Sequence, residues 1–158
     1  RDAVRIGLVE DDPVMGGSIV QRIELEGGTI AWWKTGGQAV EAIAATSGCL
    51  DIVICDIRLP DMSGEDVFRE FAGRPDSPPF VFITGYGEID QAVRLMRMGA
   101  SDYLLKPFED ERFFAAVESA RANFGQRQIN RPRILPRIPI AAMGIQAAVV
   151  LRPADTAP

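Results

Sequence analysis

Histidine is absent from this chain of 158 residues, and cysteine occurs only twice. Without an imidazole there can be no Ser-His-Asp triad, no Cys-His pair and no metal site that uses histidine. Any bound metal must be held mainly by oxygen atoms, which favours Mg²⁺, Mn²⁺ or Ca²⁺. A nucleophile must be a carboxylate, a hydroxyl, a thiol or a lysine amine that works without imidazole.

Long apolar runs and an excess of positive charge are also missing. The longest apolar stretch, residues 138–151, is interrupted by Pro139 and Gln146 and is too short to span a bilayer. No signal peptide is recognised at the start of the sequence. Cys55 lies within an apolar run and is predicted to be a buried free thiol. We therefore expect a cytoplasmic protein without membrane contact, and the net charge of −5 argues against direct nucleic-acid binding.

Short apolar runs alternate with helical periodicity from residue 4 to residue 124. The runs have the composition of buried parallel strands and cover residues 4–9, 29–33, 52–55, 80–83 and 103–105. Helical patterns lie between them, and the last helix is predicted to run from about Phe108 to Phe124. This order predicts an α/β domain with a parallel sheet and right-handed crossovers.

The helix predicted after Gly85-Tyr86-Gly87 has a mixed composition. Its expected buried face follows helical spacing and consists of Ile89, Ala92, Val93 and Met96. The residues expected to point outward combine apolar and basic side chains, as interaction surfaces do, and are Arg94, Leu95, Arg97 and Met98.

Two dipeptides stand out near the first predicted helix and the second predicted strand. Gly16 and Gly17 fall inside the helix, where glycine is unfavourable, and are interpreted as leaving room for a partner helix. Trp32 and Trp33 must lie on opposite faces of the strand, and both are predicted to be buried under helices.

The strand–helix alternation ends after residue 124. Residues 125–158 contain five arginines, a single acidic residue and five prolines, so their net charge is +4. We interpret them as a linker, as a tail, or as the remnant of a missing output domain, outside the sheet.

Chemically reactive side chains follow four of the predicted strands. Glu10 and Asp11 follow the first strand, Asp56 the third, Thr84 the fourth and Lys106 the fifth. Ligands of open parallel sheets bind beyond the carboxyl ends of the strands, so these side chains are predicted to converge.

This set of residues suits phosphoryl transfer. Clustered carboxylates repel one another unless a cation or a proton shares the site, and Mg²⁺ or Mn²⁺ is the expected cation. Asp56 is the best candidate nucleophile because it lies at the centre of the cluster. Lys106 could pair with phosphoryl oxygens, and the Thr84 hydroxyl could donate a hydrogen bond to a further one.

Four segments of the sequence resemble the receiver domain of two-component response regulators. They are LVEDDP at 8–13, ICDIRLPDMSG at 54–64, FITGYG at 82–87 and GASDYLLKPF at 99–108. The resemblance covers residues 4–124 and predicts a receiver domain over residues 1–124. Residues 84–108 are most similar to receivers of enhancer-binding transcriptional activators.

The resemblance implies a flavodoxin-like (βα)5 doubly wound sheet with strand order 2-1-3-4-5. It also implies that a histidine kinase or a phosphotransfer protein phosphorylates Asp56. Asp11 and Asp56 would bind the metal directly, together with the backbone carbonyl of Arg58, and Glu10 would act indirectly. Such a domain signals and does not turn over a substrate as an enzyme does.

The resemblance also implies a switch. Lys106 would pair with the phosphoryl group, while Thr84 and Tyr103 would transmit its presence to the surface formed by the fourth helix, the fifth strand and the fifth helix. This surface would bind a partner or form a homodimer.

Other functions remain open from the residues alone. A small Mg²⁺-dependent phosphatase with an aspartate nucleophile is the main alternative, although such enzymes need an acid where this chain has Arg58. A flavin- or nucleotide-binding module would need a phosphate loop where Glu10, Asp11 and Asp12 stand. The basic tail could support only a non-specific contact with nucleic acid.

Overall fold

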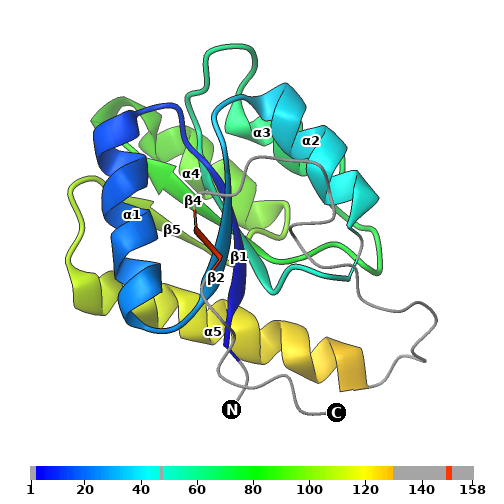
Figure 1. The fold of residues 1–158 in the computed structure, drawn as a ribbon. Coiled ribbons are helices and arrows are strands. Elements are labelled where there is room, and N and C mark those ends of the chain that lie inside the picture. Colours follow the sequence, from blue (N-terminus) through cyan, green and yellow to red (C-terminus); the bar gives the residue numbers. More distant parts are fainter. Residues whose placement is uncertain (1–2, 47, 130–148, 151–158) are drawn as a thin grey trace.

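The computed structural model describes residues 3–46, 48–129 and 149–150 of the chain. Parallel strands alternate with helices along the chain (Figure 1). The strands are β1 (Arg5–Val9), β2 (Thr29–Trp33), β3 (Ile52–Asp56), β4 (Phe80–Thr84) and β5 (Asp102–Leu105). The helices are α1 (Pro13–Leu25), α2 (Gly36–Ala45), α3 (Gly64–Arg69), the 3-10 turn η1 (Tyr86–Glu88), α4 (Ile89–Arg97) and α5 (Asp110–Ile129).

The five parallel strands have the spatial order 2-1-3-4-5, as predicted. A sixth strand, β6 (Val149–Val150), pairs antiparallel with the outer edge of β2 at Thr29 and Ile30. The expectation that nothing after residue 124 joins the sheet is therefore wrong for these two residues. An unpaired strand edge leaves backbone donors and acceptors unsatisfied, and β6 pairs with part of that edge.

Helices cover both faces of the sheet. One core lies between the sheet and α1 and α5, and the other lies between the sheet and α2, α3 and α4. Successive residues of β3 alternate between the two cores, with Ile52 and Ile54 on one side and Val53 and Cys55 on the other. This alternation explains why each strand reads as a continuous apolar run. Cys55 is a buried free thiol, as predicted.

The start and end of α1 follow their sequence signals. The Asp12 side chain accepts a hydrogen bond from the backbone N–H of Val14 at 2.9 Å, so Asp12 caps the helix and Pro13 occupies its first turn. The chain leaves the helix through Gly27, whose φ of +79° is in the left-handed region that glycine adopts readily. Because α1 begins at Pro13 and β1 ends at Val9, the acidic residues between them lie at the carboxyl end of β1.

Two predictions about the helices are corrected by the structure. On α4, Leu95 is fully buried and Val93 is 40% exposed, the reverse of the predicted orientation. The helix turns Ala92 and Leu95 towards the core because α4 is also held through its polar residues to α3.

Helix α5 begins at Asp110 and continues to Ile129, five residues beyond the predicted end. Of its predicted apolar face, Phe113, Val117 and Ala120 are buried, and the Phe124 side chain lies outside what the structure describes.

Gly16 makes room for a side chain of this domain and not for a partner helix. A Cβ atom at Gly16 would overlap the indole ring of Trp32, whereas one at Gly17 would meet open space. Trp33 is buried, whereas Trp32 is half-buried with its ring against Gly16 of α1, so the predicted burial is complete for Trp33 and only partial for Trp32. Among the described helices, none combines the length and apolar character needed to cross a membrane.

Candidate functional site

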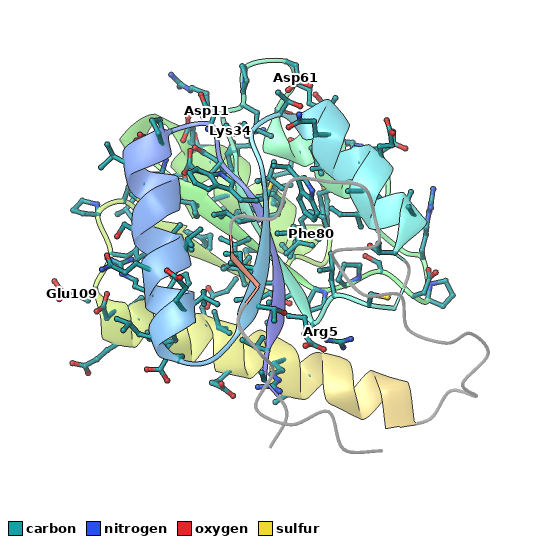
Figure 2. All side chains as sticks on the ribbon, in the orientation of Figure 1. Arg5, Asp11, Lys34, Asp61, Phe80 and Glu109 are labelled. Atoms are coloured by element: carbon teal, nitrogen blue, oxygen red, sulfur yellow. The ribbon has the colours of Figure 1, made fainter. Side chains whose placement is uncertain are left out.

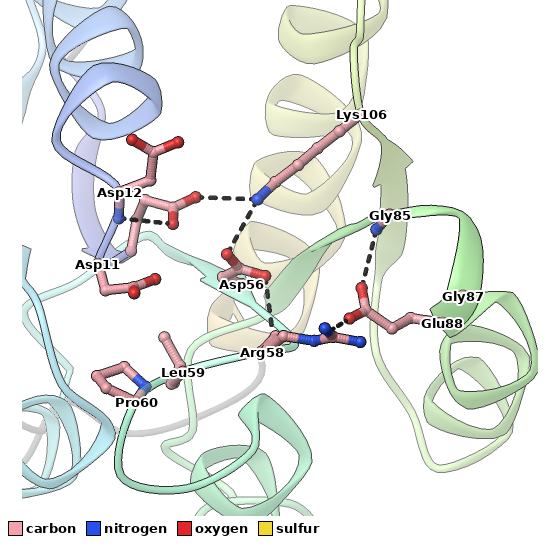
Figure 3. A pocket seen from close by; sticks show the side chains of 11 residues that line it. Asp11, Asp12, Asp56, Arg58, Leu59, Pro60, Gly85, Gly87, Glu88 and Lys106 are labelled. Carbon is pink, nitrogen blue, oxygen red and sulfur yellow. Dashed lines mark hydrogen bonds and ion pairs between the residues drawn. The ribbon is translucent and has the colours of Figure 1, made fainter.

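An open cleft of about 500 Å³ lies at the carboxyl edge of the sheet (Figure 3). Its lining comes from the last residue of β3 and from the segments that follow β1, β3, β4 and β5, as expected for an open parallel sheet. The lining residues are Glu10, Asp11, Asp12, Asp56, Arg58, Leu59, Pro60, Gly85, Gly87, Glu88 and Lys106. The predicted convergence of Glu10, Asp11, Asp56 and Lys106 is thus present in the structure.

Asp56 is held from two sides at the end of the central strand β3. Its Oδ2 accepts a hydrogen bond from Lys106 Nζ at 3.0 Å, and its Oδ1 accepts one from the backbone N–H of Arg58 at 3.1 Å. Lys106 is itself fixed because its backbone N–H donates to the carbonyl of Thr84 at 2.8 Å. Burial alone would lower the pKa of Lys106, but the carboxylates of Asp56 and Glu10 outweigh this effect and raise it. Lys106 is therefore a cation at neutral pH.

Glu10 is fully buried beside this pair. Its Oε2 accepts a hydrogen bond from the backbone N–H of Asp12 at 3.1 Å. Its Oε1 lies 3.4 Å from Lys106 Nζ and has no hydrogen-bond partner within the described part of the chain. Burial, reinforced by the hydrogen bond and negative charge of Asp56, raises the pKa of Glu10 from 4.5 to about 8. Without a cation, the buried Glu10 carboxyl therefore favours its protonated form, because Lys106 does not fully offset the burial and the negative charge of Asp56.

The acidic residues fit a hard divalent cation. Ligand oxygens of Glu10, Asp11 and Asp56 all lie within 4.8 Å of one another. Asp11 is exposed to solvent, whereas the other two are buried, so a cation could enter from the open side. Glu10 Oε1, which accepts no hydrogen bond from the described residues, and the absence of histidine both suit an all-oxygen metal site.

The predicted switch residues lie outside the cleft lining. Thr84 is fully buried, and its hydroxyl donates a hydrogen bond to the carbonyl of Gly85 at 3.0 Å. Tyr103, on β5, is half-buried and packs against the core on the α4 side of the sheet. In this conformation the Thr84 hydroxyl binds Gly85 and the Tyr103 side chain packs in the core, so their predicted roles at Asp56 stay predictions.

An ion pair at the mouth of the cleft was not predicted from the sequence. Arg58 Nε lies 2.8 Å from Glu88 Oε2, and Glu88 Oε1 accepts a hydrogen bond from the backbone N–H of Gly85 at 2.9 Å (Figure 3). An acidic residue three positions after a helix-capping residue often accepts a hydrogen bond from the backbone N–H of that residue. The spacing of Gly85 and Glu88 could therefore have predicted the hydrogen bond between them. The ion pair itself joins residues 30 positions apart, and no local pattern indicates it.

A buried carboxylate outside the cleft lining links α3 to α4. Glu65 accepts hydrogen bonds from Arg94 at 2.6 Å and Gln91 at 3.2 Å on α4, and from two nitrogens of Arg69 on its own helix. The hydrogen bonds from Arg94 and Arg69 lower the pKa of Glu65 to about 2. Glu65 is therefore ionised at neutral pH and fixes α4 against α3.

Comparison with known proteins identifies the family. The family model of the response regulator receiver domain matches residues 6–118. The chain belongs to this family. The family predicted from the four sequence motifs is thereby confirmed, and the acidic cluster of Glu10, Asp11 and Asp56 corresponds to the metal site expected of a receiver domain.

Relatives of this receiver include transcriptional regulators. It is 36% identical over 105 residues to the transcriptional regulatory protein QseB of Escherichia coli O157:H7, covering 66% of this chain and 47% of QseB. It is 33% identical over 141 residues to the C4-dicarboxylate transport transcriptional regulatory protein DctD of Rhizobium meliloti, covering 89% of this chain and 30% of DctD. The receiver thus spans less than half the length of either relative.

Solved structures support the same assignment. The signal receiver domain of a putative Luxo repressor protein from Vibrio parahaemolyticus superposes with a TM-score of 0.74 at 28% sequence identity. The match covers 83% of this chain and 99% of that chain.

Proposed function

We propose that this receiver accepts a phosphoryl group on Asp56 from a phosphohistidine of a histidine kinase or a phosphotransfer protein. The observation that carries the proposal is the position of Asp56, which is 3.0 Å from the Lys106 ammonium and clustered with the carboxylates of Glu10 and Asp11. An Asp56 oxygen would attack phosphorus and form an acyl phosphate, while the donor imidazole leaves. The receiver supplies no histidine of its own, in agreement with a donor on another molecule.

We assign the cluster to Mg²⁺ or Mn²⁺. Asp11 and Asp56 would bind the cation directly with the backbone carbonyl of Arg58, and Glu10 would act on it indirectly. When bound, the cation neutralises charge on the phosphoryl oxygens. Lys106 would keep the attacking Asp56 oxygen in place and afterwards pair with a phosphoryl oxygen, because its ammonium lies between Asp56 and Glu10.

Phosphorylation is proposed to act through Thr84 and Tyr103. The Thr84 hydroxyl would exchange the Gly85 carbonyl for a phosphoryl oxygen, and Tyr103 would move inward. The active state would then present the α4–β5–α5 face to a partner or to a second copy of the chain. Residues 1–124 are proposed to form the signalling domain, with residues 125–158 as a linker or tail.

The proposed activity is limited to self-phosphorylation and self-dephosphorylation. A phosphatase with an aspartate nucleophile is not favoured, because the position two residues after Asp56 holds Arg58, whose guanidinium cannot serve as a general acid. A cytoplasmic location, a part in transcriptional regulation, and no direct binding of nucleic acid or membrane by this chain are proposed with it.

Intact-mass measurement tests the proposal directly. Incubation with acetyl phosphate and Mg²⁺ should add one phosphoryl group, and peptide mapping should place it on Asp56. Asp56→Asn should prevent the mass gain, whereas Asp61→Asn, outside the cleft lining, should not. Labelling of the Asp56→Asn variant to the wild-type level would contradict the assignment of the nucleophile.

A further inference from the structure

The half-buried Trp32 reaches the acidic segment that follows β1. Its indole Nε1 donates a hydrogen bond of 2.7 Å to the backbone carbonyl of Glu10. The adjacent residue, Trp33, accepts a backbone hydrogen bond from the N–H of Glu10 at 3.0 Å. The peptide groups on both sides of Glu10 are thus tied to the end of β2, one residue before Asp11.

The Trp32 ring is itself fixed between α1 and Lys34. It lies directly over Gly16, where any Cβ atom would overlap its six-membered ring. Lys34 Nζ lies 5.0 Å from the ring centroid, within the range of a cation–π contact. Figure 2 shows Asp11 and Lys34 at the same end of the molecule. The contacts with Gly16 and Lys34 therefore help to set the direction in which the indole N–H points.

We propose that Trp32 is a positioning residue for the divalent-cation site and that Gly16 is needed for this role. The hydrogen bond from Trp32 fixes the backbone of Glu10, and this fixes the directions in which the carboxylates of Glu10 and Asp11 leave the chain. Trp32 does not contact the cation. The inference rests on the proposed function, because it assumes that these carboxylates bind a cation.

The neighbouring tryptophan supplies a matched control. Trp33 Nε1 is buried and has no hydrogen-bond partner within the described residues, so Trp33→Phe removes an indole N–H that binds nothing there. Trp32→Phe removes the N–H that binds Glu10 and keeps most of the ring. Gly16→Ala keeps the N–H and displaces the ring. Comparison of the three variants separates the hydrogen bond from general effects of losing an indole.

Affinity for Mn²⁺ is the first measurement, with free Mn²⁺ followed by its electron paramagnetic resonance signal. Trp32→Phe and Gly16→Ala should each weaken binding about tenfold, the lower end of the loss typical of removing a hydrogen-bond partner behind a metal ligand. Trp33→Phe should stay within about twofold of wild type. Thermal unfolding without metal shows whether each variant is folded.

The indole resonances of the unmodified chain give a second measurement that needs no variant. Addition of Mg²⁺ should shift the Trp32 Nε1–H resonance more than that of Trp33, because only Trp32 binds the Glu10 carbonyl. Wild-type Mn²⁺ affinity in folded Trp32→Phe, or equal losses in Trp32→Phe and Trp33→Phe, would overturn the inference and leave the cation site intact. An unmodified chain that binds no Mn²⁺ would overturn the cation site and the inference together.

Discussion

Replacement of Glu10 by glutamine should stabilise the metal-free receiver at alkaline pH. The pKa of Glu10 is raised to about 8, so folding favours its protonated form. A carboxyl group with a raised folded pKa contributes most stability at low pH, and this contribution is lost as the pH rises from about 4.5 to about 8. Glutamine has nearly the same shape and cannot ionise, so the variant should escape this loss.

The rise of the pKa from 4.5 to about 8 sets an upper limit of ~5 kcal/mol on the effect. Lys106 and the solvent that enters the open cleft reduce the limit, and we expect about 1–3 kcal/mol at pH 8. No histidine contributes to the change in stability between pH 5 and pH 8, because the chain contains none.

Urea unfolding with EDTA at pH 5 and pH 8 measures the effect. Wild type should lose stability between these pH values, and Glu10→Gln should lose much less. Glu41→Gln, an exposed carboxylate outside the cleft lining, serves as the control and should follow wild type. Mg²⁺ at pH 8 should restore wild type more than the variant. A wild-type stability that stays level or increases from pH 5 to pH 8 without metal would refute the reasoning.

Three further outcomes are expected. Glu65→Gln should lower the free energy of unfolding by about 1–2 kcal/mol at pH 7, because the arginines that donate its charged hydrogen bonds are more than half exposed. In urea titrations, this difference from wild type should vanish as the pH falls from 4.5 towards 2. Leu95→Ala should destabilise by about 2–4 kcal/mol and Val93→Ala by less than about 1 kcal/mol in the same assay. Removal of residues 130–158 should preserve cooperative thermal unfolding and change stability by no more than about 1 kcal/mol, since among the described residues it deletes only β6.

Local signals in the sequence were sufficient for most of the strands and for the site. β2 has the predicted bounds because Gly27 and Gly28 precede Thr29 and the apolar run of residues 30–33. Asp56 ends β3, and Lys106 directly follows β5. Because the carboxyl ends of parallel strands lie at the same edge of the sheet, both residues could be placed at that edge. Such predictions need only the chain order and the parallel arrangement.

The orientation of α4 could not be predicted in this way. Its sequence offers two apolar faces, one through Val93 and one through Leu95, and helical periodicity permits either. The choice depends on Gln91 and Arg94, which must face Glu65 on another helix. Bonds between residues more than 25 positions apart set the orientation, and a local pattern contains no information about them.

The segment that follows Asp56 holds α4 at two points. Arg58 pairs with Glu88 immediately before α4 begins, and Glu65 pairs with Arg94 within it. The segment between these residues is itself compact, because the backbone N–H of Gly64 donates to the carbonyl of Ile57 at 2.6 Å. The stretch from Asp56 to Glu65 therefore carries the proposed phosphoacceptor and helps to position α4. We expect added negative charge at Asp56 to act on Arg58, whose ion pair with Glu88 would offer a route to the start of α4 in addition to the route proposed through Thr84.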